Sequence, residues 1–136
     1  MDKPILKRGF TLIELLVVVA IIGVLVSVGV VSYSSVQKKS RDSRRREDMK
    51  AVQAGWEQYY MDNDATYPPS GCAISTTYLP EGLPQDPKDS SPYVYTKTCT
   101  TSTYCFCARM EAGTGNATNT TCSYGSGTYY CVSNLQ

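Results

Sequence analysis

Glu14 is the residue whose type and position most clearly indicate a chemical role. It is the only charged residue within residues 10–31, an apolar run of 22 residues. A helix of that length spans about 33 Å, which is enough to cross a bilayer. Inserting a carboxylate into such a segment costs roughly 2.5 kcal/mol or more, so its presence predicts a functional role. A buried carboxylate also needs a partner.

Six cysteines form the second group of residues with reactive side chains. An even number of cysteines in a small polar segment predicts disulfides and an oxidising compartment, although the sequence alone does not settle their pairing. The short Gly-rich loop favours a Cys122–Cys131 pair, and a hairpin would let Cys99 reach Cys105 or Cys107. The disulfide candidates are Cys72, Cys99, Cys105, Cys107, Cys122 and Cys131.

Other site chemistries find little support in the sequence. There is no histidine, which excludes Ser-His-Asp and Cys-His catalysis and histidine-bearing zinc sites. One residue separates Cys105 from Cys107, whereas zinc and thiol redox motifs commonly use two. We therefore expect no metal, no cofactor and no enzymatic activity.

The element that must position Glu14 is a long helix, predicted over about residues 10–62. No proline lies between Pro4 and Pro68, so nothing in the sequence forces a break. The second half has apolar residues at spacings of three and four, which predicts one face that packs on the rest of the protein. These residues are Met49, Val52, Trp56, Tyr59 and Tyr60.

Residues 63–136 predict a small antiparallel sheet. Alternating side chains indicate strands over residues 93–96, 104–110 and 129–132, and we expect three or four strands in all. The four prolines within residues 80–92 predict an irregular connection. The fold class is therefore α+β, with a long N-terminal helix packed on the sheet. A domain this small relies on its disulfides as well as its core.

Residues 38–48 form a strongly basic segment, with six positive and three negative side chains. The first interpretation is a solvated helix face with Asp42–Arg46 and Arg44–Asp48 pairs. The second is contact with acidic lipid headgroups or with acidic residues of a neighbouring subunit. DNA binding is the least favoured, because it needs a basic patch exposed on the surface of the assembled protein, which a helix near the core does not readily provide.

The N-terminal segment resembles the prepilin signature of type IV pilins and type II secretion pseudopilins. A basic leader, a Gly–Phe junction, a glutamate after four further residues and a long apolar helix carry the likeness. The resemblance implies that prepilin peptidase cuts between Gly9 and Phe10 and that Phe10 is then N-methylated. The cut would create an amine on Phe10, one helical turn from Glu14, so the two charges could neutralise each other in the membrane. In a filament the resemblance implies that Glu14 pairs with the Phe10 amine of a neighbouring subunit. The residues of the motif are Gly9-Phe10-Thr11-Leu12-Ile13-Glu14-Leu15-Leu16.

The resemblance also implies how the chain is organised. The basic segment would favour a cytoplasmic location by the positive-inside rule. We nevertheless expect this segment outside the cytoplasm. The leader must face a peptidase on the cytoplasmic side of the membrane, and the cysteine-rich tail suits an oxidising exterior. The expected pilin fold has a leader (1–9), a transmembrane and filament-core helix (10–35), an amphipathic continuation (36–62) and a disulfide-rich β domain (63–136). The subunit is then held in the inner membrane, with its C-terminal domain outside the cytoplasm, before it enters a filament outside the cell or in the periplasm.

The function implied is that of a structural subunit in a helical, homo-oligomeric, type IV pilus-like filament. Its partners would be prepilin peptidase, the pilus or secretion machinery of the inner membrane, and membrane lipid, with nucleic acid disfavoured. A second interpretation is the major pseudopilin of a type II secretion system, because residues 83–87 and the Tyr93-Val94-Tyr95 segment also resemble that group. A DNA-uptake pilus and a membrane-anchored binding module that does not polymerise are also compatible with the sequence.

Two further features concern the C-terminal loops. Some major pseudopilins bind calcium there, but residues 112–136 contain no acidic side chain, so the resemblance does not bring such a site to this chain. Asn-x-Thr sequons at Asn116 and Asn119 predict an exposed polar loop. Residues 51–136 carry three positive and seven negative groups, so attraction to the basic segment of a neighbour would make filaments salt-sensitive.

Overall fold

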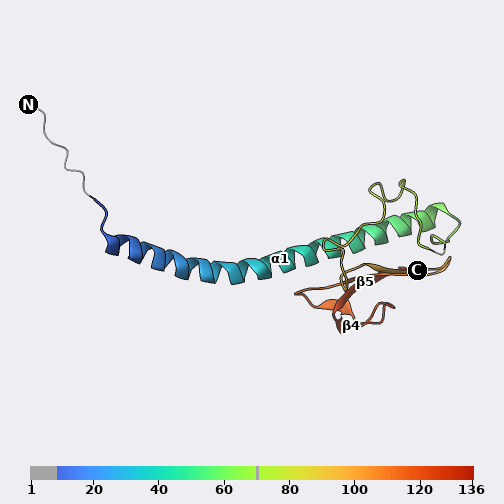
Figure 1. The fold of residues 1–136 in the computed structure, drawn as a ribbon. Helices are drawn as coiled ribbons and strands as arrows, with labels where there is room; N and C mark the ends of the chain where they lie inside the picture. Colours follow the sequence, from blue (N-terminus) through green and yellow to red (C-terminus); the bar gives the residue numbers. More distant parts are fainter. Residues whose placement is uncertain (1–8, 70) are drawn as a thin grey trace, which may run out of the picture. The chain divides into compact units, whose positions relative to one another are not determined.

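A computed structural model describes residues 9–69 and 71–136 of the chain. The structure divides into two compact units, with the boundary between Val36 and Gln37. Of the predicted leader, only Gly9 falls within the described residues; the rest of that prediction lies outside them. The described elements are one helix followed by five strands. Figure 1 labels the helix α1 and the strands β4 and β5.

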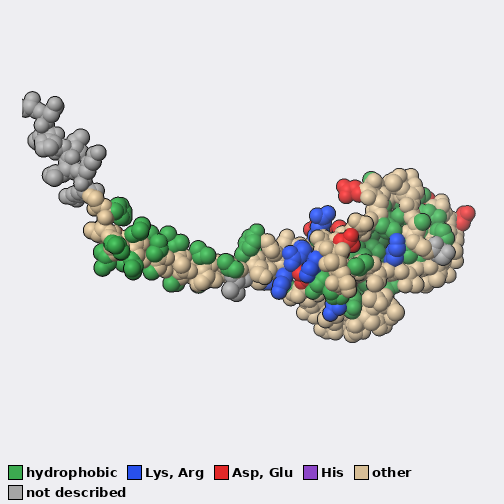
Figure 2. All heavy atoms as spheres, in the orientation of Figure 1, with side chains coloured by type: hydrophobic (Ala, Val, Ile, Leu, Met, Phe, Trp, Pro, Cys, Tyr) green, Lys and Arg blue, Asp and Glu red, His purple; other side chains and the backbone are tan. Residues whose placement is uncertain are grey.

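Helix α1 spans Leu12–Asp62 and confirms the long helix predicted from the sequence. Its part in the first unit is mostly apolar, and the exposure of its large hydrophobic side chains runs from 47% at Val18 to 82% at Leu12. In Figure 2 hydrophobic side chains cover the visible surface of this unit. The helix is long and apolar enough to cross a membrane, with a mean hydropathy of 3.0 in its most apolar stretch. A surface of this kind is stable only against lipid or other apolar helices.

The second unit contains one antiparallel sheet in the order β1-β2-β5-β3-β4. It has five strands rather than the three or four expected. The two missed strands, β3 and β4, are short and rich in glycine, so they lack the apolar alternation by which strands are found. The first strand also begins at Thr96, after the Tyr93–Tyr95 segment predicted to belong to it. The strands are β1 (Thr96–Cys99), β2 (Tyr104–Arg109), β3 (Gly115–Ala117), β4 (Tyr124–Gly127) and β5 (Tyr129–Ser133).

The core of the second unit lies between the later part of α1 and one face of the sheet. Met49, Val52 and Trp56 have no exposed surface, which confirms the predicted stripe, while Tyr59 and Tyr60 are half-buried. The Trp56 ring meets the ring of Tyr104 edge-on, with 4.4 Å between centroids. Aromatic pairs of this geometry contribute about 0.5–1.5 kcal/mol beyond the area they bury.

A close backbone contact fixes the next segment against the same helix. A Cβ atom at Gly55 would lie 2.9 Å from the carbonyl oxygen of Tyr78 and 3.0 Å from the side chain of Leu79. Only glycine leaves room for this approach, so a residue that weakens a helix by propensity is required here by packing.

Candidate functional site

The first candidate site is the start of α1, where Thr11 and Glu14 form reciprocal hydrogen bonds. The Glu14 Oε2 atom accepts from the Thr11 backbone amide at 2.9 Å and from its hydroxyl at 2.7 Å. The Glu14 amide donates in return to the Thr11 hydroxyl at 3.3 Å. This arrangement is a capping box, in which two amides that a helix end leaves unpaired are satisfied by side chains.

The capping box explains how one chain can satisfy the carboxylate without a second subunit. Sequence reasoning considered only the Phe10 amine as a partner for Glu14 and missed Thr11. The signal was present, because a threonine followed three residues later by a glutamate before an apolar run is the capping-box pattern. Gly9 and Phe10 precede the helix, and Phe10 is 83% exposed. The junction is therefore accessible, while the assignments of the cleavage site and of N-methylation stay predictions.

All six cysteines are joined in three disulfides within the second unit. The pairs are Cys72–Cys99, Cys105–Cys122 and Cys107–Cys131. The first pair ties the segment after α1 to the end of β1. The other two lie on one face of the sheet, where the four sulfur atoms are within 4.8 Å of one another. Sulfur atoms paired in this way offer no thiolate to a metal ion.

The expected pairings, Cys122–Cys131 and a hairpin bridge from Cys99, are wrong. In an antiparallel pair, residues directly opposite each other project from the same face. Cys99 lies opposite Tyr104 in the register of β1 and β2, so it shares the core face and not the face of Cys105 and Cys107. Cys107 lies directly opposite Cys131 of β5, which leaves Cys122 for Cys105.

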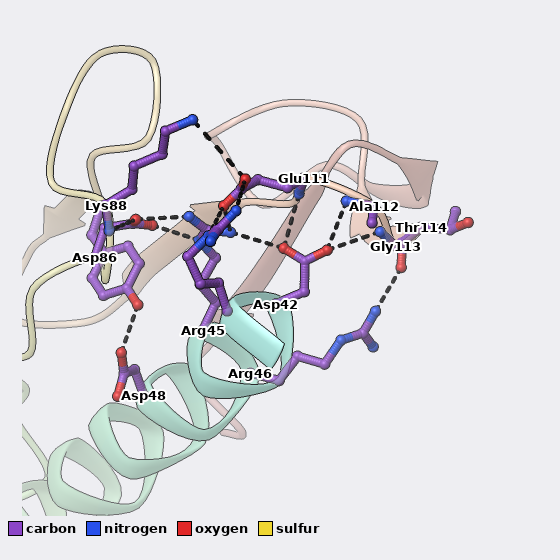
Figure 3. Close-up of polar contacts among 12 residues, drawn as sticks. Asp42, Arg45, Arg46, Asp48, Asp86, Lys88, Glu111, Ala112, Gly113 and Thr114 are labelled. Atoms are coloured by element: carbon purple, nitrogen blue, oxygen red, sulfur yellow. Dashed lines mark hydrogen bonds and ion pairs between the residues drawn. The ribbon is translucent and has the colours of Figure 1, made fainter. Parts of the chain in front are cut away.

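The second candidate site is a cluster of charges around Arg45, a side chain with no exposed surface. Figure 3 shows its guanidinium between three carboxylates. Its nitrogen atoms lie 2.6 and 2.8 Å from the Asp86 oxygens, 2.9 Å from Asp42 and 2.8 Å from Glu111. Arg41 adds a bidentate pair with Glu111, both bonds being 2.7 Å long. The helix, the proline-rich loop and the loop after β2 are thereby joined at one point.

The electrostatics of this cluster favour the charged forms of Glu111, Asp42 and Arg45. Hydrogen bonds from Arg41 and then Arg45 outweigh burial and lower the pKa of Glu111 to about 2. Burial acts to raise the pKa of Asp42, but amide bonds from residues 111–113 outweigh it and the net shift is downward. Burial likewise opposes the charge of Arg45, and bonds to its carboxylates raise its pKa overall. Glu111, Asp42 and Arg45 therefore stay ionised at neutral pH.

The arrangement corrects the predicted solvated helix face. Asp42–Arg46 and Arg44–Asp48 are not among the ion pairs of the described residues. Arg46 donates instead to the carbonyl of Thr114, and Asp48 accepts from the hydroxyl of Tyr95. Sequence reasoning missed this because Asp86 and Glu111 are distant in sequence, and only the fold brings them to the helix.

Glu57 is a third buried acidic group that sequence reasoning missed. Its Oε1 atom accepts from the Tyr104 hydroxyl at 2.9 Å, the Tyr67 hydroxyl at 3.2 Å and the backbone amide of Leu135 at 3.1 Å. Burial, with the Glu57 charge second, raises the pKa of Tyr67 to about 12. Glu57 thus fastens the C-terminal end of the chain to α1. The sequence signal that could have indicated this role is the position of Glu57 directly after Trp56, the tryptophan of the core stripe.

The features predicted for the C-terminal loops have different environments in the structure. Asn119 is exposed, whereas the side chain of Asn116 is half-buried and bonds to both backbone groups of Cys131. Asp86, an acidic residue of the proline-rich loop, is engaged by Arg45. The prediction of one exposed polar loop is therefore correct for Asn119 and wrong for Asn116.

Comparison with known proteins identifies the N-terminal segment. Residues 6–30 match the Prokaryotic N-terminal methylation motif. They contain the exposed junction, the capping box and the apolar helix described above. The N-terminal segment of this chain is thus that of a type IV pilin-like protein.

Two curated proteins are similar to this pilin-like chain. It is 37% identical over 58 residues to "Type IV major pilin protein PilA" of Myxococcus xanthus (strain DK1622), over 43% of this chain and 26% of that protein. It is 29% identical over 83 residues to "Type II secretion system core protein G" of Dickeya chrysanthemi, over 61% of this chain and 54% of that protein. The pilin-like chain thus spans about a quarter and about half of their lengths. No solved structure matches it significantly.

Proposed function

We propose that this chain is a structural subunit of a type IV pilus-like filament. The observation that carries the proposal is the start of α1, where one carboxylate stands in an exposed apolar helix directly after the Gly9–Phe10 junction. In the membrane Thr11 satisfies Glu14. In the filament the Phe10 amine of a neighbouring subunit takes over as its partner, because a charge buried among apolar helices needs an opposite charge.

The steps around assembly follow from the same segment. Prepilin peptidase removes the leader after Gly9, Phe10 is N-methylated, and inner-membrane machinery extracts the subunit from the lipid. The apolar part of α1 then bundles with that of other copies, and the second unit faces outward, where its disulfides are stable. The role is structural rather than catalytic, and it involves neither a cofactor nor nucleic acid.

A second candidate, a major pseudopilin of a type II secretion system, is favoured by one specific observation. The similarity to the secretion protein extends over 61% of the chain, against 43% for the pilin. Deleting the gene distinguishes the two. Loss of surface filaments in electron micrographs supports a pilus, and loss of protein export with surface filaments intact supports the secretion filament.

The variant that tests the proposal is Glu14→Val. We expect N-terminal sequencing to show a normal cut before Phe10 and fractionation to show normal membrane levels, while filaments fall at least tenfold because the incoming amine finds no carboxylate. Glu47→Val makes the same change at an exposed position of α1 and serves as the control. Normal filament yield from Glu14→Val would refute the proposed assembly step.

A further inference from the structure

The spacing of charges along α1 places two lysines at a defined depth. Residues 15–37 lie between Glu14 and Lys38 and carry no charge. As 23 helical residues they span about 35 Å, slightly more than the hydrocarbon core of a bilayer, about 30 Å thick. If Glu14 is near one boundary, as the proposed function requires, Lys38 and Lys39 lie at the headgroups of the opposite leaflet. Tyr33, 66% exposed, is placed where interfacial aromatic residues gather.

The structure also shows which cationic side chains of the basic segment are free of polar contacts within the part of the chain that it describes and can therefore bind another molecule. Arg41 and Arg45 are paired with carboxylates of their own unit, and Arg46 is bonded to Thr114. Lys38 and Lys39, by contrast, are exposed, and neither takes part in an ion pair within the described residues. In Figure 2 Lys and Arg side chains gather near the start of the second unit. Folding thus engages three of the four arginines, while Arg44 stays exposed together with Lys38 and Lys39, the two cations nearest the apolar helix.

We propose that Lys38 and Lys39 bind anionic phospholipid headgroups in the leaflet opposite the leader. This inference rests on the membrane-spanning orientation in the proposed function. A lysine has a flexible apolar stem and a compact charge, so it can reach a phosphate group without a fixed geometry. The contact holds the unassembled subunit at a fixed depth and offsets the unfavourable location of a basic segment outside the cytoplasm.

Lipid is favoured over the acidic surface of a second copy. Folding removes three of the seven acidic groups of residues 51–136 from such a contact, because Asp86 and Glu111 are buried in ion pairs with Arg45 and Glu57 is buried in the core. The four that stay exposed are Asp62, Asp64, Glu81 and Asp89. The lysines also follow directly on the apolar stretch, at the depth where phosphate groups are most concentrated. Attraction to an anionic surface contributes about fivefold in affinity for each lysine close to it.

The test measures phospholipid binding to the full-length, mature chain in detergent by native mass spectrometry. Phosphatidylglycerol and phosphatidylcholine are titrated separately, and the apparent affinity for each is compared. We expect the unaltered chain to prefer phosphatidylglycerol, and K38Q/K39Q to lower that affinity by up to about thirtyfold. The control is K50Q/K97Q, which removes the same charge from exposed positions further along the chain and is expected to retain the preference.

The outcomes separate this inference from the proposed function. An unchanged preference in K38Q/K39Q, an equal loss in the control, or no preference in the unaltered chain would overturn it. So would a K38Q/K39Q variant that keeps lipid binding but loses cross-linking between subunits, because the lysines would then serve a second copy. Glu14→Val is run in parallel: it is expected to lose filaments but keep the lipid preference, so a failure of assembly alone leaves this inference standing.

Discussion

At the scale of single residues, the charges of this chain have two contrasting environments. Glu14 lies in an apolar helix and is satisfied by one neighbour on its own chain, so it is free to exchange that partner for another. Arg45 is enclosed by three carboxylates of the folded domain and has no comparable freedom. Breaking a buried pair by removing one partner costs about 3–5 kcal/mol, which identifies Arg45 as a structural residue.

The pKa of Glu111 predicts an acid-sensitive contribution to stability. Its value in the folded state is about 2, below the ordinary 4.5, so its ion pairs stabilise the domain fully above about pH 4.5. This contribution is lost as the pH falls toward 2, because the unfolded chain takes up the proton first. We expect the denaturation midpoint to fall over that range, and Glu111→Gln to lower the midpoint at pH 7 while flattening its dependence on pH.

The matched control for that experiment is Glu81→Gln, which alters an exposed glutamate in the proline-rich loop. Its profile should follow that of the unaltered domain. A Glu111→Gln profile that keeps the full fall below pH 4.5 would mean that other carboxylates account for it.

At the scale of elements, the face of the sheet from which each cysteine projects determines which cysteines can form a disulfide. Cys105 and Cys107 are two residues apart on β2 and therefore lie on the same face, away from Trp56. Cys99 lies on the core face and pairs with Cys72, across a separation of 27 residues. One sheet thus has a disulfide on its core side and two on the other.

The pairing predicts which cross-linked peptides proteolysis should release. Mass spectrometry without reduction should find Cys72–Cys99 as one linked pair and the remaining four cysteines in two further pairs. Replacing both Cys72 and Cys99 by serine should lower the free energy of unfolding by about 2–4 kcal/mol, because a long loop of the unfolded chain is then unconstrained. Detection of Cys122–Cys131, or of six alkylated thiols in the exported protein, would contradict the structure.

At the scale of the whole molecule, the two units have different stabilising environments. The first has an apolar surface that needs lipid or other helices, whereas the second contains the buried core, the sheet and all three disulfides. The junction near Val36 and Gln37 is therefore where an assembly element meets a domain stable in water.

This division predicts that residues 37–136 fold without the apolar helix. When produced in an oxidising compartment, the fragment should be soluble and unfold in one cooperative transition, followed by near-ultraviolet circular dichroism of Trp56. A fragment of residues 51–136 lacks Arg45 and Met49 and should be markedly less stable. Aggregation of the longer fragment, or no difference between the two, would show that the core depends on the first unit.

The sequence by itself determined the features that depend on local order. The apolar run, its lone glutamate, the Gly–Phe junction and the stripe through Trp56 are adjacent or one helical turn apart, so periodicity and composition were enough to predict the helix and the resemblance. The even number of cysteines likewise predicted disulfides.

Tertiary structure decided what depends on residues distant in the chain. Asp86 and Glu111 reach Arg45 only because a loop and a hairpin return to the helix, and the cysteine pairing follows from strand register, which shifts every side chain to the other face with a slip of one residue. The same contacts engage Arg41, Arg45 and Arg46 of the basic segment and leave Lys38, Lys39 and Arg44 exposed. Charge counted along the sequence could not separate these two groups, because burial and pairing are properties of the fold.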